Sequence, residues 1–276
     1  MGSHVEGSAE TVDRADIESS SSVGNNYPGA TTSSEIAANL ESVRVRIAQA
    51  CERSGRDPGS VRLLPVTKTI DDQRIRMAYG VGCRSFGENK VQEAAKKAAA
   101  LKDLPDAAWA VIGHLQSNKA KVVAKFASEF QALDSLKLAE ALDRRLEIEA
   151  RPLSVLIQVN TSDEPSKYGL NPADVPTFAK ALSKYSWLRV RGLMTLAVLS
   201  EDRDRVRACF RCLKGVQERL KDGSFGGAAF DDLSMGMSGD FEIAVEEGAT
   251  TVRVGQAIFG ARALPDSYYW PSQRSQ

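Results

Sequence analysis

The chain has 276 residues, 42% of them hydrophobic, which is enough for the core of one large barrel or two small domains. Basic and acidic residues are equal in number, at 36 each, which excludes an overall field that would draw the protein to nucleic acid or to a membrane. No apolar run approaches the length of a membrane span and the N-terminal stretch lacks the apolar core of a signal peptide, so a cytoplasmic protein is expected.

The N-terminal part of the chain predicts a disordered leader over residues 1–34, because Ser, Gly, Asp, Glu and Asn dominate it and large apolar residues are scarce. From residue 35 apolar residues recur at helical spacing until Gly55, with Ser34 as the candidate N-cap. A barrel domain is expected over residues 35–265, followed by a C-terminal tail over 266–276.

After this first helix, strand-like and helix-like segments alternate. The expected strands span residues 62–67, 84–86, 109–113, 130–133, 153–160, 188–195, 232–235 and 251–254. The expected helices span residues 71–80, 88–102, 117–127, 135–149, 172–185, 201–221, 238–247 and a short stretch from 256. Eight such units predict an α/β fold, a single (β/α)8 TIM barrel with an extra N-terminal helix. An open doubly wound sheet is the alternative, because a count of elements does not prove closure.

The first strand ends on a single amine, since the stretch VRLLPVTK is apolar almost throughout and finishes at Lys68. An ammonium group is costly to bury, so a lysine in this position points into solvent, into a salt bridge or into a reactive site. Chemistry in a TIM barrel collects where strands end and βα loops begin. Lys68 is therefore the candidate reactive group, with a solvated lysine as the alternative.

Two further loops are suited to binding a phosphate. Phosphates in such barrels commonly sit between the loops after strands seven and eight. Ser238 and Gly239 follow the seventh strand, where they offer a hydroxyl and backbone N–H groups at the start of a helix, and Gly255 and Gln256 follow the eighth. The alternative is that the glycines are turn residues and that Ser238 is only an N-cap.

A lysine facing a phosphate site suggests two chemistries. One is a Schiff base with a sugar phosphate, as in lysine-dependent aldolases, and the other is an internal aldimine with pyridoxal 5'-phosphate (PLP). Arg253 bears on the choice because it is a charged residue in an apolar strand. Pointing inward, it would face the pyridine nitrogen and weaken the ring as an electron sink, whereas pointing outward it would form a salt bridge to a helix.

Other polar residues have open roles. His114 is the only histidine outside the leader and is the candidate general acid or base, or else a loop hydrogen-bonding group. Asn89 orients a ring substituent or satisfies the loop backbone. Cys209 and Cys212 form a CxxC pair on an expected helix, and because no second Cys/His pair completes a tetrahedral site, no metal is expected. Lysines at 119, 121 and 125 indicate a solvated helix face, not a nucleic-acid site.

Several stretches together resemble the pyridoxal phosphate homeostasis protein family, which is similar to the N-terminal barrel of alanine racemase standing alone. They read VTKT, FGENKVQEA, IGHLQSNK, QVNTSDEPSKYG, RGLMTL, LSMGMSGDFEIAVEEGAT and VRVGQAIFGAR, between about residues 35 and 262. The residues to which the resemblance gives roles are Lys68 for the aldimine, Ser238, Gly255 and Gln256 for the phosphate, Arg253 for the pyridine nitrogen, and Asn89 and Met235 for the cofactor's surroundings. Gln256 stands where a small hydroxyl residue is expected, so only its backbone N–H is assigned to the phosphate.

The resemblance implies a carrier of PLP that acts in intracellular PLP homeostasis and delivery and in amino-acid and keto-acid balance, with PLP-requiring apo-enzymes as possible recipients. Alanine racemase uses a second, β-rich domain for its opposing base, and the residues after about 265 are too few to build one. The alternative is a PLP-dependent enzyme with weak racemase-type activity, in which His114 or Tyr168 donates the proton. An aldolase without cofactor is a third possibility.

Overall fold

The structure is a computed structural model that describes residues 27–162, 164, 167–223 and 228–261. Residues 1–26 of the predicted leader, residues 262–265 at the end of the predicted barrel and the whole predicted tail lie outside the described residues. The division of the chain at residues 34 and 265 therefore stays a prediction.

Eight parallel strands form one sheet in the order β1-β8-β7-β6-β5-β4-β3-β2. The strands are β1 (Arg62–Pro65), β2 (Ser85–Glu88), β3 (Ala108–Val111), β4 (Glu129–Leu133), β5 (Leu153–Gln158), β6 (Leu188–Met194), β7 (Asp232–Ser234) and β8 (Thr251–Val254). Strand β1 pairs in register with β8, and just beyond β1 a parallel bridge joins Val66 to Gly87 of β2. The sheet is thus a nearly closed barrel, which confirms the predicted (β/α)8 fold and rules out the open sheet.

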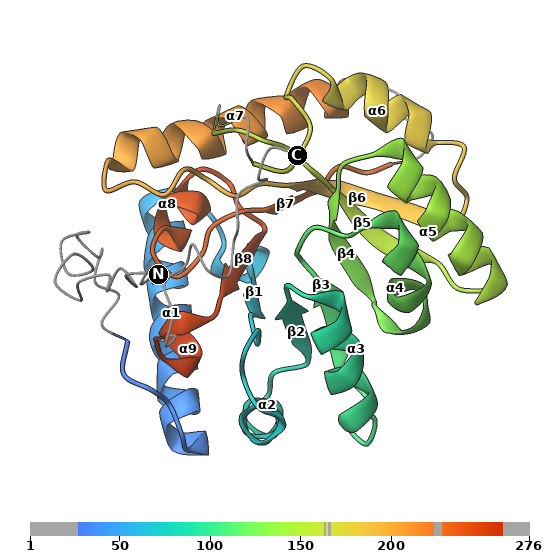
Figure 1. Ribbon diagram of the computed structural model, residues 1–276. Helices are drawn as coiled ribbons and strands as arrows, with labels where there is room; N and C mark the ends of the chain where they lie inside the picture. Colours follow the sequence, from blue (N-terminus) through green and yellow to red (C-terminus); the bar gives the residue numbers. More distant parts are fainter. Residues whose placement is uncertain (1–26, 163, 165–166, 224–227, 262–276) are drawn as a thin grey trace, which may run out of the picture.

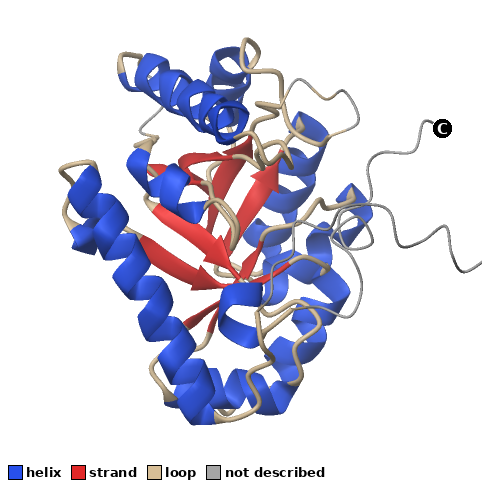
Figure 2. Cartoon of the chain, turned by 90° about the vertical axis from the view of Figure 1, so that its left-hand side faces the viewer, coloured by secondary structure: helices blue, strands red, loops and turns tan. Residues whose placement is uncertain are grey.

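Helices surround the strands on the outside of the barrel (Figure 2). They are α1 (Ser33–Arg53), α2 (Asp72–Gly80), α3 (Val91–Ala100), α4 (Ala120–Phe126), α5 (Leu136–Ile148), α6 (Val175–Leu182), α7 (Arg203–Lys221), α8 (Phe241–Glu246) and α9 (Gln256–Phe259), with short 3-10 turns at Pro58–Ser60 and Ser117–Lys119. Figure 1 shows α3, α4 and α5 following one another along one side and α7 lying along the top, where it packs against β6, β7 and α8. Among these helices none is long and apolar enough to cross a membrane.

The extra helix α1 begins earlier than its apolar pattern predicts. Ser34 is not the N-cap, because Thr32 accepts a hydrogen bond from the Glu35 backbone N–H while the Glu35 carboxylate accepts one from the Thr32 N–H. This reciprocal pair satisfies two backbone donors that a helix start otherwise leaves open. The predicted extra helix is confirmed, and its start lies at Ser33.

Helix α1 fastens the beginning of the barrel to its end. It packs against α8 and α9, and the side-chain amide of Asn39 donates to the backbone carbonyl of Ile258 at 2.9 Å. Just after the helix, the Arg56 guanidinium donates to the carbonyls of Val245 and Ala249 at 2.6 and 2.8 Å. These contacts hold the last βα units against the first strand and so support the closure between β1 and β8.

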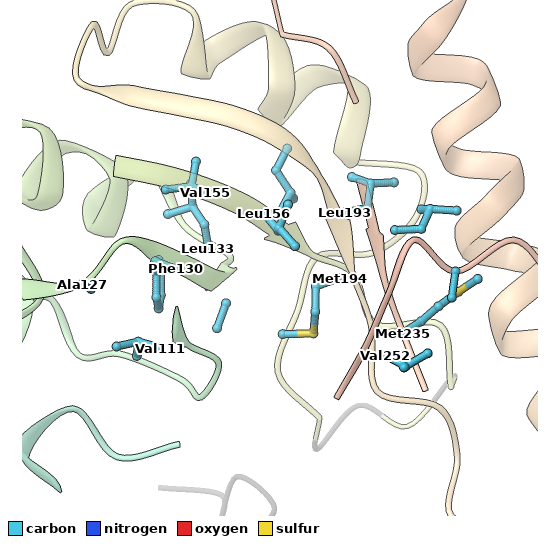
Figure 3. Packing of buried hydrophobic residues seen from close by; sticks show 14 of the residues in the cluster. Val111, Ala127, Phe130, Leu133, Val155, Leu156, Leu193, Met194, Met235 and Val252 are labelled. Carbon is cyan, nitrogen blue, oxygen red and sulfur yellow. The ribbon is translucent and has the colours of Figure 1, made fainter. Parts of the chain in front are cut away.

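The main hydrophobic core lies between the strands and the helices. Figure 3 shows part of it, with Phe130, Leu133 and Val155 on β4 and β5, and with Met235 beside Val252 at the other end. A separate small cluster of Leu64, Val66, Ala110 and Ile112 belongs to β1, β3 and the segments after them. Side chains alternate between the two faces of a strand, so this small cluster fills the barrel interior on the β1 and β3 side.

Polar side chains occupy the rest of the barrel interior. The Ser234 hydroxyl of β7 donates to the side-chain carbonyl of Gln131 of β4 at 2.7 Å, although these two strands are not neighbours in the sheet. The Gln131 amide donates in turn to Glu129 at 2.6 Å, and the Arg62 guanidinium of β1 donates to the same carboxylate. Contacts between strands that do not pair cross the interior, so a hydrogen-bonded row runs through the barrel.

Candidate cofactor site

Lys68 follows the end of β1 and lies between the two strands that neighbour it. The Val66 N–H donates to the Val254 carbonyl of β8 and the Thr67 N–H to the Gly87 carbonyl of β2, both at 2.9 Å. Lys68 comes directly after these paired residues, and only 4% of it is exposed. The structure therefore places the predicted reactive amine inside the mouth of the barrel, and the alternative of a solvated lysine is wrong.

Gly255 lies against Val66, which follows β1 and comes two residues before Lys68. A Cβ on Gly255 would come 3.0 Å from the Val66 carbonyl oxygen, a tight contact, so glycine favours the close approach of the backbone after β8 to the segment before Lys68. Gln256 is the first residue of α9 and is half-buried. The backbone after β8 thus lies next to Lys68, as the barrel closure requires.

Ser238 connects the loops after β7 and β8. Its hydroxyl accepts a hydrogen bond from the Ala257 backbone N–H at 3.3 Å, and its carbonyl accepts one from the Tyr27 hydroxyl at 3.0 Å. Ser238 is buried, whereas Gly239 is exposed and a Cβ built there meets nothing within 4 Å. The two loops predicted to bind a phosphate are therefore brought together.

The sequence places the helix after β7 too early. Helix α8 begins at Phe241 with Asp240 as its N-cap, so Ser238 is not an N-cap and precedes the helix. The Asp240 carboxylate accepts from the Met237 N–H at 2.6 Å, which closes a turn that the sequence pattern does not separate from the helix. Ser238 and Gly239 belong to this turn.

Arg253 points into the barrel. Its two guanidinium nitrogens donate to the Ser234 hydroxyl and to the Thr195 carbonyl, each at 2.7 Å, and only 3% of the residue is exposed. The alternative of an outward salt bridge to a helix is wrong. Burial lowers the pKa of Arg253 to about 10, which leaves the guanidinium charged at neutral pH.

Asn89 follows β2 and lies against the loop after β3. A Cβ on Gly113 would come 2.2 Å from both the backbone oxygen and the side-chain oxygen of Asn89. Only glycine allows the two segments to approach this closely. Asn89 is half-buried and its side-chain oxygen is enclosed.

Two other residues with predicted roles lie in different surroundings. Met235 is fully buried in the main hydrophobic core next to Val252, and its N–H donates to the Thr251 carbonyl at 3.1 Å (Figure 3). His114 lies at the surface, where its ring stacks on Tyr168 with centroids 3.9 Å apart. The role of each toward the cofactor stays a prediction.

A group that the sequence reading missed lies behind Lys68. Glu88 is fully buried at the end of β2, and its carboxylate accepts hydrogen bonds from the Thr67 hydroxyl at 2.5 Å and from the Lys97 amine at 2.9 Å. Desolvation raises the pKa of Glu88, against the lowering effects of Lys97 and Thr67. The signal was available in the stretch FGENKVQEA, where an acidic residue ends a strand, but its meaning depends on a contact with Lys97 of the next helix.

The Cys209 and Cys212 pair is part of α7. Cys209 is buried and Cys212 is half-buried, and among the described residues no group of three or more His, Cys, Asp or Glu side chains is placed to hold a metal ion. The pair thus contributes to the packing face of the helix.

Comparison with known proteins gives a consistent set of relatives. The family model described as the alanine racemase N-terminal domain matches residues 38–263. The pyridoxal phosphate homeostasis protein of Pseudomonas aeruginosa is 44% identical over 229 residues, which make up 83% of this chain and 96% of that protein. The protein of the same name from Escherichia coli strain K12 is 39% identical over 234 residues, with coverages of 83% and 97%.

Solved structures agree with these relatives. PipY from Synechococcus elongatus, with PLP bound, superposes with a TM-score of 0.72 at 38% identity and covers 82% of this chain and 100% of its own. Alanine racemase from Corynebacterium glutamicum superposes with a TM-score of 0.60 at 18% identity, covering 85% of this chain and 63% of its own. The second likeness shows the barrel fold alone.

Proposed function

This chain belongs to the pyridoxal phosphate homeostasis protein family, and we propose that it binds PLP covalently through the amine of Lys68, holding and delivering the cofactor. The observation that carries the proposal is the position of Lys68, an amine with 4% exposure at the carboxyl end of β1 beside the loop after β8. The PLP bound to PipY, a relative of 38% identity, supports it. Through the supply of PLP, the protein would affect the balance of amino acids and keto acids.

The residues around Lys68 fit the parts of this cofactor. An aldehyde condenses with a lysine amine with loss of one water, and this is the chemistry that PLP supplies when bound. The hydroxyl of Ser238 and the backbone N–H groups of Gly239, Gly255 and Gln256 would bind its phosphate, since the hydrogen bond between Ser238 and Ala257 joins the two loops. The open space at Gly239 leaves the backbone accessible to an anion.

Arg253 would face the pyridine nitrogen, and Asn89 and Met235 would line the cofactor. A guanidinium that stays charged keeps the nitrogen unprotonated and weakens the ring as an electron sink. This arrangement suits a protein that holds PLP better than one that stabilises carbanions. Holding, and not turnover, is therefore the proposed task of Lys68.

The recipients of the cofactor would be PLP-requiring apo-enzymes in the cytoplasm. Three of the four cysteines, Cys51, Cys83 and Cys209, are buried as thiols, which is typical of proteins in a reducing compartment. Transfer to a recipient is checked by mixing the loaded protein with an apo-enzyme and following recovery of that enzyme's activity, with free PLP at the released concentration as the control.

The covalent linkage is tested by incubating the protein with PLP, reducing with borohydride and mapping the modified peptide by mass spectrometry. The expected product is one modified residue, Lys68, which is absent from Lys68→Ala and unchanged in Lys121→Ala, a variant of an exposed lysine on α4. Equal labelling of the wild type and Lys68→Ala would contradict the proposal.

The alternative is a weak racemase-type enzyme, and the observation that favours it is the stacked pair of His114 and Tyr168, the two proposed proton donors. Enantiomer exchange of single amino acids in deuterated water decides between the two functions. Turnover above the background of free PLP that His114→Ala abolishes would support the enzyme, whereas turnover equal to the background would support the carrier.

A further inference from the structure

Lys97 uses all of its hydrogen-bonding capacity on the segment beside Lys68. An ammonium group has three N–H donors, and Lys97 directs them to the Thr67 carbonyl at 2.7 Å, Glu88 at 2.9 Å and Glu93 at 2.7 Å. Lys97 is 7% exposed, and its bonds to Thr67 and Glu88 are buried while the bond to Glu93 is partly buried. A buried ammonium is tolerated only when it is paired in this way, and the geometry of its partners is then strongly constrained.

Thr69, directly after Lys68, has an unfavourable backbone conformation. Its φ angle is +68°, in the left-handed region that a β-branched residue rarely adopts. Its N–H donates to the Glu93 carboxylate at 2.8 Å, the same oxygen that accepts from Lys97. Such a conformation persists only where the surrounding contacts over-determine it. Two contacts do so here, namely the hydrogen bond to Glu93 and the backbone bond from the Ile70 N–H to the Thr67 carbonyl at 2.9 Å that closes the turn around Thr69.

These contacts hold the residues on both sides of Lys68. Thr67 is bound through its carbonyl by Lys97 and through its hydroxyl by Glu88, and Thr69 is bound through its N–H by Glu93. Leu64 and Val66 belong to the interior cluster, so by alternation Thr67 turns toward the helices and Lys68 toward the barrel interior. The hydrogen bonds from Glu93 and Lys97 of α3 therefore hold the side of the turn that faces the helices, while the Lys68 side chain lies on the side that faces the barrel interior.

We propose that Glu93 and Lys97 are positioning residues that hold residues 67–69 in a strained turn and thereby keep the amine of Lys68 in place for reaction with an aldehyde. This inference rests on the proposed function, because it names the residues that support Lys68, the amine that the proposed function uses. Glu88 completes the support by accepting from both Thr67 and Lys97. The role proposed for Glu93 and Lys97 is exerted through the segment around Lys68, by their bonds to the Thr69 N–H and the Thr67 carbonyl.

The inference is tested by the rate at which Lys68 is modified, using PLP as the probe, borohydride quenching at timed intervals and mass spectrometry of the Lys68 peptide. Glu93→Gln and Lys97→Met should slow the modification by about ten- to a hundredfold, because a displacement of about 1 Å at a reacting group costs up to that factor. Lys96→Met is the matched control, since Lys96 is the exposed neighbour on the same helix. It should react at the wild-type rate.

A second substitution separates positioning from general damage. Glycine adopts φ of +68° without cost, so Thr69→Gly should relieve the strain that Glu93 holds in check. The double variant Glu93→Gln, Thr69→Gly is expected to recover most of the rate lost in Glu93→Gln. A variant that was merely misfolded would not be rescued in this way. The comparison of Glu93→Gln with the double variant therefore tests the inference even where Lys97→Met fails to fold.

A readout without PLP distinguishes a failure of this inference from a failure of the proposed function. Competitive acetylation of the protein with acetic anhydride over a range of pH gives the reactivity and the pH profile of Lys68 directly. The profile should shift in Glu93→Gln, return in the double variant and stay unchanged in Lys96→Met. If Lys68 of the wild type takes up no PLP, the proposed function fails; if modification rates and acetylation profiles are the same in the wild type, Glu93→Gln and every folded Lys97 variant, the positioning role fails.

Discussion

Arg253 donates a hydrogen bond to the hydroxyl of Ser234 at 2.7 Å inside the barrel, and the same hydroxyl donates to Gln131 at 2.7 Å. The Ser234 hydroxyl therefore uses its single O–H donor on Gln131 and one of its two lone pairs on Arg253. A second bond from Arg253 to the Thr195 carbonyl fixes the plane of the guanidinium. The direction of this charged group is thus set by the protein alone.

Ser234→Ala is expected to destabilise the protein by about 1–3 kcal/mol, because it leaves a buried guanidinium N–H and a buried amide oxygen without partners. Denaturant unfolding of the variant measures the loss. Ser186→Ala, at an exposed serine, is the control and should leave the free energy of unfolding unchanged. A stability equal to that of the wild type in Ser234→Ala would mean that Arg253 and Gln131 find other partners.

Gly113→Ala is expected to displace Asn89, since the added Cβ would lie 2.2 Å from two of its oxygens. A displaced Asn89 should lower both the melting temperature and the extent of PLP uptake on Lys68, measured by borohydride trapping. Gly80→Ala serves as the comparison, because its Cβ meets nothing within 4 Å and its φ angle is ordinary. Normal uptake in Gly113→Ala would argue against a role for Asn89 in the site.

Glu93 is expected to make the stability of the protein depend on acid pH. Its burial acts to raise the pKa, but the bonds from Lys97 and from the Thr69 N–H outweigh this and hold the pKa below its usual value. The unfolded state then binds more protons, so the contribution of Glu93 is present above the unfolded pKa of about 4.3 and is lost as pH falls through the lower folded pKa.

Urea unfolding of the wild type and Glu93→Gln over this acid range measures the effect. The variant should lose less stability than the wild type as the pH falls, because glutamine does not titrate. Parallel curves for the two proteins would show that Glu93 ionises with the same pKa in the folded and unfolded states. Glu88 is expected to act in the opposite direction, since its folded pKa is raised and its contribution is lost as pH rises through that value.

Arg56→Met is expected to destabilise the closure of the barrel. The substitution keeps an apolar stem but removes the donors to the Val245 and Ala249 carbonyls, and each carbonyl left unsatisfied costs about 1–3 kcal/mol. Arg44→Met is the matched control, because Arg44 is exposed and, within the described part of the chain, its ion pair is with Glu41 at 3.8 Å. A melting temperature for Arg56→Met as high as that of Arg44→Met would assign the closure to apolar packing alone.

Much of the fold could be predicted because its signals are local. The alternation of apolar segments with helical periodicity identifies the eight units, and parallel strands with right-handed crossovers then favour a barrel. The ends of short elements were less predictable. The start of α8 at Phe241 and the cap of α1 at Thr32 depend on turn and capping hydrogen bonds that several polar residues in each stretch could have made.

The sequence by itself predicted a reactive amine at Lys68 and a Schiff-base chemistry for it, and both stay predictions. An apolar strand that ends on Lys68 has few uses for an ammonium group, and the glycines after the seventh and eighth strands indicate a close approach of backbone to a ligand. These are properties of single segments, and they can be recognised from residue type and spacing.

Only the tertiary structure decided what holds these groups in place. The bond between Ser234 and Gln131 joins residues 103 positions apart on strands that do not pair, and the contact of Lys97 with the Thr67 carbonyl joins residues 30 positions apart through a helix that packs against the barrel. A periodic pattern predicts which face of an element is buried but not which side chains of other elements it contacts. Closure of the barrel determines those contacts, because it brings the ends of strands that are distant in sequence together at one mouth.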